Sequence, residues 1–315
     1  MRPPGADSSG FTVIEDQLAF LPLPKGMNNA RALSINDSGV AVGWWGNFIT
    51  GDPVAREAFV WPPDGEAFGL HGVHGVTLSE AHDINDSGRV VGSVYAQYDQ
   101  RAFILDGGRA KILPPIPGGL SSNARAVNEW GDVVGDGRLP PTTPGTIDHA
   151  GFVYIDGSFH VIEAPRQFNR ASARDINRFR QVVGNFEHSL GAATPETFIW
   201  QHGRVALLSD LITGPLPNPA NVSCCINDLG QIVMSNRNPQ ELFEPAKLVL
   251  TPRDRPVGDI DIDCRVDQRD LAFLLGRWGC PDQAADLDDD GLVGFADLTM
   301  LLANWRPVAT GEKLE

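Results

Sequence analysis

The chain has 315 residues, a formal net charge of −15 and a pI of about 4.8. A surface this acidic repels phosphate backbones, so we expect no nucleic-acid partner. The 42% of hydrophobic residues can form a substantial core, and no apolar run reaches the roughly 18 residues of a transmembrane helix, so none is predicted.

The first segments are a polar tail and a short apolar strand. Residues 1–10 contain no apolar stretch, so no secretory signal peptide is visible and we expect a flexible tail. The run Phe11–Asp16 then has the composition of a β-strand that stands alone before any repeat.

A motif built on Ile-Asn or Val-Asn then occurs five times. Its asparagines are separated by 49, 43, 49 and 50 residues, and they are Asn36, Asn85, Asn128, Asn177 and Asn227. A period of this size is typical of propellers and solenoids. Asn can bond its own backbone in a turn and the Gly that usually follows can take positive φ, so each copy predicts a tight β-hairpin.

Each repeat contains up to four strand-like runs. In the first repeat they are Ala32–Ile35, Val40–Trp44, Ala58–Trp61 and Ala67–Leu70, whereas the fifth repeat has no fourth run after Leu250. Four antiparallel strands per repeat predict a mainly β, five-bladed β-propeller over residues 11–250, in which Phe11–Asp16 completes the fifth blade and closes the ring. An open β-solenoid with the same repeats is the alternative.

The loops between the second and third strands vary most in length. Examples of these and the blade-to-blade connections are 140–145, 191–195 and 214–219. We expect them on one face, opposite the Asn turns, and expect a carbohydrate or protein ligand there.

The repeats resemble the HAF-type extracellular repeat family over residues 11–250. The likeness rests on Ala-x-x-Ile-Asn-x-x-Gly-x-Val-Val-Gly followed by Ala-Phe-Val-Trp. The histidine that names the family is replaced in Glu57-Ala58-Phe59 and Arg101-Ala102-Phe103. This family has no defined reaction, so the resemblance implies a fold and an extracellular or cell-surface location.

A second, shorter repeat follows the linker 251–258. Each of its two loops matches the 12-residue calcium loop, whose oxygens come from positions one, three, five, seven, nine and twelve. The expected ligands for two calcium ions are Asp259, Asp261, Asp263, the Arg265 carbonyl, Asp267 and Asp270 in the first loop, and Asp286, Asp288, Asp290, the Leu292 carbonyl and Asp297 in the second. An acidic, solvated linker is the alternative.

An apolar stripe follows each loop. Leu271, Leu274, Leu275 and Trp278 recur at the same positions of the second copy as Leu298, Leu301, Leu302 and Trp305. This spacing predicts two helices whose stripes pack together, within a calcium module over 259–306 that precedes a tail, 307–315. Because unneutralised carboxylates repel, we expect folding of the module to depend on calcium.

This duplicated loop–helix pattern resembles the type I dockerin, which plugs into cohesin domains. The resemblance covers residues 258–306 and implies a cohesin-like partner. Position six of the first loop is Cys264 in place of Gly, and a Cys264–Cys280 bridge could brace that loop. Positions ten and eleven read Gln268-Arg269 and Phe295-Ala296, so the two halves would present different surfaces.

The sequence shows no recognised catalytic motif. We therefore expect a non-catalytic extracellular protein, a propeller that displays binding loops and carries a calcium-dependent docking module. The alternative is a dockerin-bearing enzyme of polysaccharide breakdown that uses carboxylates on the loop-rich face, where we expect Asp83, Asp175 and Glu80. A third hypothesis makes the calcium module a clamp on the propeller.

Overall fold

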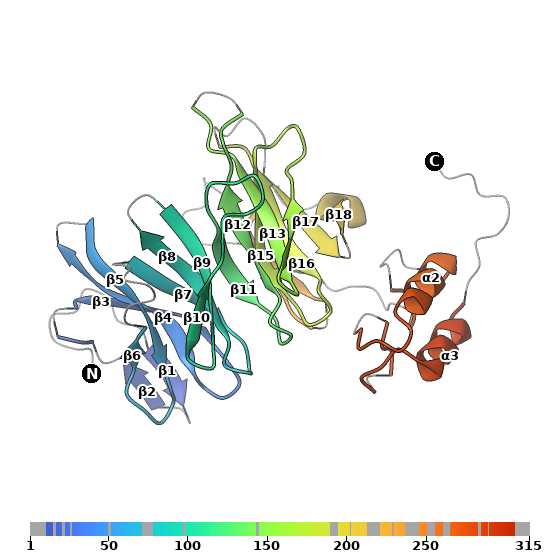
Figure 1. The fold of residues 1–315 in the computed structure, drawn as a ribbon, viewed down its shortest axis with the longest axis horizontal. Helices are drawn as coiled ribbons and strands as arrows, with labels where there is room; N and C mark the ends of the chain where they lie inside the picture. Colours follow the sequence, from blue (N-terminus) through green and yellow to red (C-terminus); the bar gives the residue numbers. More distant parts are fainter. Residues whose placement is uncertain are drawn as a thin grey trace.

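The computed structural model is mainly β (Figure 1). It describes residues 11–14, 17–20, 23–25, 27–49, 52–70, 78–96, 99–142, 145–189, 195–201, 203–212, 221–228, 230–236, 246–250, 256–260, 265–282, 285–288 and 290–305. Two eight-stranded sheets account for most of the strands, and a three-stranded sheet follows them. The prediction of a mainly β fold is confirmed.

Each eight-stranded sheet consists of two four-stranded antiparallel units, which we number from the N-terminus. Units one and two comprise β3 (Asn29–Ile35), β4 (Ala41–Ile49), β5 (Asp52–Trp61), β6 (Phe68–Gly69), β7 (Leu78–Ile84), β8 (Val90–Ala96), β9 (Asp99–Asp106) and β10 (Arg109–Ile112). Units three and four comprise β11 (Asn123–Val127), β12 (Val133–Arg138), β13 (His149–Ile155), β14 (Ser158–Ile162), β15 (Arg170–Ile176), β16 (Val182–Glu187), β17 (Glu196–Gln201) and β18 (Arg204–Leu207). Within each sheet a short parallel contact joins the two units, β5 to β7 and β13 to β15.

Within the described residues unit five has three strands, in agreement with the missing fourth run of its repeat. They are β19 (Asn221–Ile226), β20 (Ile232–Asn236) and β21 (Ala246–Leu250), and the short helix α1 (Leu208–Leu211) precedes them. The first strand of each later unit contacts the first two strands of the unit before it, so the five units are stacked in sequence.

The N-terminal strand does not pair as expected. β1 (Phe11–Ile14) pairs antiparallel with β2 (Gln17–Phe20), and the two form a separate two-stranded sheet. In the described part of the chain neither strand pairs with β21, so the prediction that Phe11–Asp16 closes the ring is wrong. β2 begins almost directly after β1 ends, and closing so short a loop costs far less entropy than recruiting a strand from the other end of the array.

The hydrophobic core lies between successive units. One cluster joins Val42 and Val60 of unit one to Val90 and Phe103 of unit two, and similar clusters join the later pairs. The phenylalanine of each third strand is fully buried at Phe59, Phe103, Phe152 and Phe198. Burial of such a ring contributes about 2–3 kcal/mol, so stacking of the units supplies much of the stability.

The motif needs glycine at two positions, for two different physical reasons. The turn glycines Gly39, Gly88, Gly131 and Gly230 have φ between 71° and 83°, as the hairpin prediction requires. The later glycine, such as Gly92, instead faces the preceding strand, where an added Cβ would lie 1.9 Å from the Glu80 carbonyl oxygen. A β-bulge between Ala81 and Asp83 brings that carbonyl close.

The C-terminal segment forms two short helices, α2 (Gln268–Gly276) and α3 (Phe295–Ala303), which pack together beside the β units (Figure 1). They begin and end at equivalent positions of the two copies, as the sequence repeat predicts. Leu274 and Leu301 are fully buried in a shared core, whereas Leu275 and Leu302 are about half exposed. The expected packing is therefore right for the centre of each stripe and wrong for these two leucines. No helix in the described ranges is long and apolar enough to cross a bilayer.

Candidate functional site

The motif asparagines organise their own turns. The Oδ1 of Asn85 accepts hydrogen bonds from the Arg89 amide at 2.9 Å and the Ser87 hydroxyl at 2.8 Å. The other four asparagines accept the equivalent amide four residues later at 2.9–3.0 Å. This confirms the expected turn chemistry.

The same asparagines also tie the units to one another, a role that the sequence analysis missed. The side-chain amide of each of the first four donates to the backbone carbonyl of the next motif asparagine. The links run from Asn36 to Asn85 at 3.1 Å, Asn85 to Asn128 at 2.9 Å, Asn128 to Asn177 at 3.3 Å, and Asn177 to Asn227 at 3.0 Å. We call these four bonds the asparagine ladder. It shows that the turns are structural.

Asp83 and Asp175 lie at the wrong end of their strands for the expected site. Each is the last residue but one of its strand, β7 or β15, next to the Asn turn rather than on the loop-rich face. Asp83 accepts the Ser34 hydroxyl at 2.6 Å and the Val127 amide at 2.9 Å, while Asp175 accepts the Ile226 amide at 2.8 Å. Both carboxylates therefore bridge neighbouring units.

The surroundings of these two acids disfavour the ionised form of their side chains. Desolvation by burial raises the pKa of Asp83, although its hydrogen bonds oppose the shift. Desolvation, with repulsion from Asp83 and Asp228, raises the pKa of Asp175 to about 6. A raised pKa can mark an acid catalyst or a strained structural contact. The backbone bonds of both groups favour the structural interpretation here.

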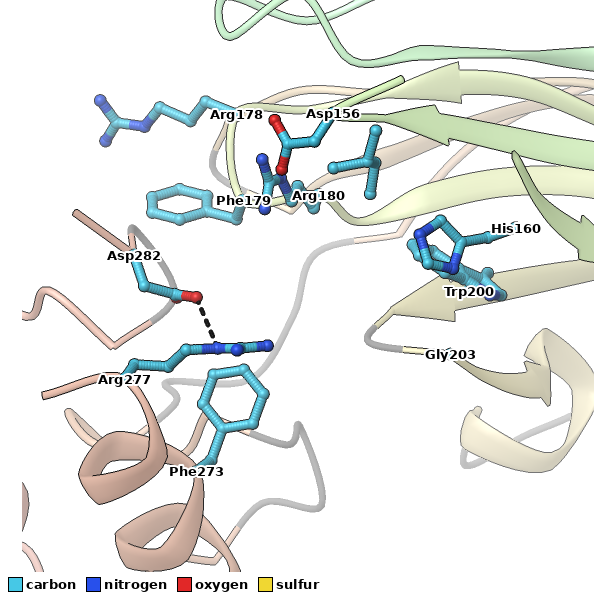
Figure 2. Close-up of a pocket in the computed structure, with 11 residues that line it drawn as sticks. Asp156, His160, Arg178, Phe179, Arg180, Trp200, Gly203, Phe273, Arg277 and Asp282 are labelled. Atoms are coloured by element: carbon cyan, nitrogen blue, oxygen red, sulfur yellow. Dashed lines mark ion pairs between the residues drawn. The ribbon is translucent and has the colours of Figure 1, made fainter. Parts of the chain in front are cut away.

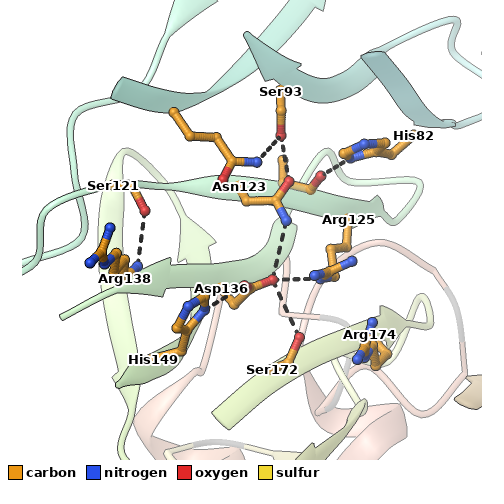
Figure 3. A network of polar contacts seen from close by, with 12 residues as sticks. His82, Ser93, Ser121, Asn123, Arg125, Asp136, Arg138, His149, Ser172 and Arg174 are labelled. Carbon is orange, nitrogen blue, oxygen red and sulfur yellow. Dashed lines mark hydrogen bonds and ion pairs between the residues drawn. The ribbon is translucent and has the colours of Figure 1, made fainter. Parts of the chain in front are cut away.

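A buried polar network lies between units two, three and four (Figure 3). At its centre is Asp136, which accepts bonds from Arg125, from His149 Nδ1 at 3.1 Å and from Asn123 and Ser172 at 3.3 Å each. Burial works to raise the pKa of Asp136, but the charge of Arg125 and the bonds from His149 and Arg125 prevail and lower it strongly. Asp136 is thus a carboxylate held as an anion.

The network continues through His82 and Glu80. His82 Nδ1 lies 2.6 Å from the Ala124 carbonyl oxygen, which can only accept a hydrogen bond, and Nε2 lies 3.3 Å from Glu80. Glu80 also pairs with Arg56. Burial would raise the pKa of Glu80, yet the bonds from His82 and Arg56 lower it. Glu80, the third of the expected catalytic acids, is engaged in an ion-pair brace.

The second calcium loop brings part of its expected ligand set together. Carboxylate oxygens of Asp286, Asp288 and Asp290 all lie within 4.8 Å of one another. Desolvation and the negative charges of Asp290, Asp297 and Asp286 raise the pKa of Asp288, although the Asp290 amide donates to it. Three clustered carboxylates could supply part of the six to eight oxygens that a calcium ion takes.

Asp270 and Asp297, the expected twelfth ligands, are buried and make matching bonds. Asp270 accepts the amides of Ile260 at 2.6 Å and Asp267 at 2.8 Å. Asp297 accepts the amides of Leu287 and Gly294, both at 2.6 Å. These two amide bonds of the first loop thus have counterparts at the equivalent positions of the second loop. These carboxylates fasten the start of the loop to the start of the helix, a role signalled by the capping spacing Asp267-x-x-Asp270.

The remaining expected ligands are distributed as follows. Asp259 and Asp267 are buried, and the Asp267 side chain caps α2 by accepting the Arg269 amide at 2.8 Å. The residues whose carbonyls were expected as ligands, Arg265 and Leu292, are exposed. Asp261, Asp263 and Cys264 lie outside the described residues. Cys280 is a free, exposed thiol, and the suggested Cys264–Cys280 bridge falls on a residue outside those described.

The donor atoms of the second loop are of the kind that calcium prefers. Its donors are carboxylates and a backbone carbonyl, the hard oxygen ligands that calcium selects. The amide bonds to Asp286, Asp290 and Asp297 leave further lone pairs, because a carboxylate can accept about four bonds. The residues that would hold the ion are Asp286, Asp288, Asp290, Asp297 and the Leu292 carbonyl.

Comparisons with known proteins add a family match. A family model described as "Protein of unknown function (DUF3466)" matches residues 24–158, which contain units one and two and most of unit three. A search of curated proteins finds no match.

Among solved structures, the chain is similar to TolB from Acinetobacter baumannii, with 10% identity and a TM-score of 0.47. That match covers 76% of this chain and 56% of TolB, so the chain spans little more than half of that protein. It is also similar to the β-propeller domain of the Trilobed protease from Pyrococcus furiosus, with 11% identity and a TM-score of 0.47, covering 76% of this chain and 72% of that one.

Proposed function

We propose that this protein is a non-catalytic extracellular binding protein, in which a five-bladed propeller-like array displays loops and a dockerin-like calcium module docks a cohesin-type partner. The observation that carries the proposal is the convergence of Asp286, Asp288 and Asp290 in a loop–helix unit whose buried amide–carboxylate bonds, to Asp270 and Asp297, recur in both copies. A solvated acidic linker would have no reason to repeat its buried amide–carboxylate bonds.

Calcium would offset part of the negative charge of the second loop. The ion supplies positive charge and takes six to eight oxygens, and Asp297 would join the three clustered acids as the ligand nearest the helix. A calcium concentration 100 times the dissociation constant adds about 2.7 kcal/mol to the stability of the bound fold.

An exposed aromatic pair supports docking. Phe295 is 79% exposed and lies edge-on to Trp278, 37% exposed, with ring centroids 5.0 Å apart. Phe295 is at position ten of the second loop, where the resemblance places partner contacts. Paired, exposed aromatic rings commonly anchor protein interfaces, so a partner with an apolar recess is the chemistry that this surface fits.

The state of the candidate acids supports the non-catalytic hypothesis. Asp83 and Asp175 brace strands at the turn end, and Glu80 is committed to Arg56 and His82. A hydrolase would need carboxylates presented to substrate on the loop-rich face. The enzyme alternative therefore loses the three acids on which it rested.

The test is calorimetric titration of the full chain with calcium, followed by binding to a panel of cohesin domains. We expect calcium binding that is weakened by Asp288→Asn with Asp290→Asn, and unchanged by Asp64→Asn, an exposed acid between β5 and β6. Cohesin binding should need calcium and should be lost in Phe295→Ser. No heat of calcium binding would refute the calcium module; calcium binding without any cohesin binding would refute the partner alone.

A further inference from the structure

The fourth Asn turn departs from the other four. In the other four turns an acid directly follows the asparagine and a glycine stands two residues after that acid, as in Asp86-Ser87-Gly88. The fourth turn instead reads Arg178-Phe179-Arg180. Arg180 has φ of 58°, in the left-handed region where the other four turns have glycine. A side chain held in this unfavourable conformation points to a use beyond the turn.

The altered turn lines a pocket of about 360 Å³ (Figure 2). Arg178, Phe179 and Arg180 form one wall, and Phe273 and Arg277 of the α2 region form the facing wall. In Figure 2 the guanidinium groups of Arg180 and Arg277 and the two phenylalanine rings face the same space, whereas the Arg178 guanidinium extends outward at its rim, beyond the Phe179 ring. The pocket thus combines cationic groups with flat apolar faces.

Acidic partners orient two of the arginines. Arg180 Nε lies 2.7 Å and Nη2 3.3 Å from the buried carboxylate of Asp132, and Arg277 Nε lies 3.0 Å from Asp282. A guanidinium has five N–H donors in a rigid fork, so a pair made through the Nε edge leaves other donors for a ligand. Fixing the forks in advance reduces the entropy lost on binding.

The third arginine, Arg178, is exposed and stacks on its neighbour. Its guanidinium lies 4.7 Å from the centre of the Phe179 ring, and its backbone amide donates to Asp228 at 2.9 Å. Similarly, the guanidinium of Arg277 lies 5.3 Å from the centre of the Phe273 ring. Each wall therefore presents a stacked pair of guanidinium and phenyl ring, the arrangement that receives an acidic group next to a planar one.

We propose that this pocket binds a small organic anion in which a carboxylate or a phosphate is attached to a flat ring. The arginines would receive the acid group and the phenylalanines the ring. The volume is at the small end of the range of about 300–1,000 Å³ for ligand pockets, which suits one or two rings. Asp156 and Asp282 also line the pocket and offset arginine charge there, so the site would select an anion by its directed N–H donors rather than by net charge.

The probes are benzoate and adenosine monophosphate, each compared with its neutral counterpart, benzyl alcohol or adenosine. They are titrated calorimetrically into the full chain, with calcium chloride in excess so that the helices stay in one state. We expect at least one anion to bind at least tenfold more tightly than its neutral counterpart. Binding of benzoate alone assigns the site to carboxylates, and binding of adenosine monophosphate alone assigns it to phosphate esters.

The variants are Arg178→Gln and Arg277→Gln, with Arg166→Gln as the matched control. All three arginines are exposed, so the fold should persist, and circular dichroism checks that it does. Each pocket variant should weaken the anion about tenfold, whereas the control should bind like the parent. Failure of both anions to bind, equal affinity for the neutral probes, or pocket variants indistinguishable from Arg166→Gln would overturn the proposal.

Discussion

Replacing Asn85 should weaken the junction between units two and three. Its side chain is buried and makes three hydrogen bonds, one to the Asn128 carbonyl and two within its own turn. At about 1 kcal/mol net for each bond, Asn85→Ala should lower the free energy of unfolding by about 3 kcal/mol. For a chain of this size that corresponds to a fall in Tm of roughly 5 °C.

Asn85→Asp separates the ladder from the turn. The carboxylate can still accept the Arg89 amide and the Ser87 hydroxyl, but it faces the Asn128 carbonyl with an oxygen in place of the donor. We therefore expect this variant to be at least as destabilised as Asn85→Ala. Asn36→Ala is the control, because Asn36 is only half-buried, and its loss should be about half as large.

The assay is urea unfolding followed by tryptophan fluorescence, with the m-value checked for each variant. Parent-like stability of Asn85→Asp would show that the inter-unit bond contributes nothing, and the ladder would then be a geometric coincidence of the repeat. A loss in Asn36→Ala equal to that in Asn85→Ala would show that burial does not set the magnitude.

Three further substitutions test the packing and the buried charges. Gly135→Ala should destabilise by more than about 2 kcal/mol in urea unfolding, because the added Cβ would lie 1.9 Å from the Asn123 carbonyl oxygen; the parallel control, Gly108→Ala, adds its Cβ in open space, and any loss there reports backbone strain alone. Asp136→Asn should cost about 3 kcal/mol, since it leaves Arg125 without its buried anion, and stability equal to the parent would contradict the brace. Asp175→Asn should remove a pH dependence of stability. The raised pKa of Asp175, about 6, means that the folded state binds the proton more tightly than the unfolded state does. The contribution of Asp175 to stability is therefore present at low pH and is lost between about pH 4 and 6, by up to about 3 kcal/mol. Unfolding free energies of parent and variant measured across that range should converge in acid and differ at neutral pH, with Asp83 and Asp228 common to both; parallel profiles would contradict the assignment.

The sequence predicts the period, the turns and the strand runs well, because those features depend on local chemistry. Asn at each turn and Phe in each third strand of units one to four occupy the expected positions. The inter-unit bonds of the same asparagines depend on how far apart successive turns are stacked, and no local pattern encodes that distance. Likewise, Asp83 was expected near the start of its strand, but β7 begins five residues earlier, at Leu78, and so places Asp83 at the opposite end.

The C-terminal module shows the same division. The repeat of the loop and its apolar stripe correctly predicts two helices with equivalent bounds. It does not predict that Leu275 and Leu302 remain about half exposed, because the shared core is occupied by the residue before each of them, Leu274 or Leu301. Nor does it distinguish Asp270 as a calcium ligand from Asp270 as an acceptor of amides, since one carboxylate satisfies both patterns.

The glycine that faces the bulge has a consequence for how such repeats can diverge. In units one to four the bulge lies opposite this glycine, whereas in unit five the irregularity moves to between Asn221 and Ser223, and the glycine becomes Met234, which is buried. The residue at this position and the place of the bulge therefore change together. A repeat can accept a large residue at the glycine position only if the bulge of its first strand moves as well. A single substitution at that glycine would therefore produce a clash. Anyone building an idealised version of the array has to choose one of the two combinations for each repeat.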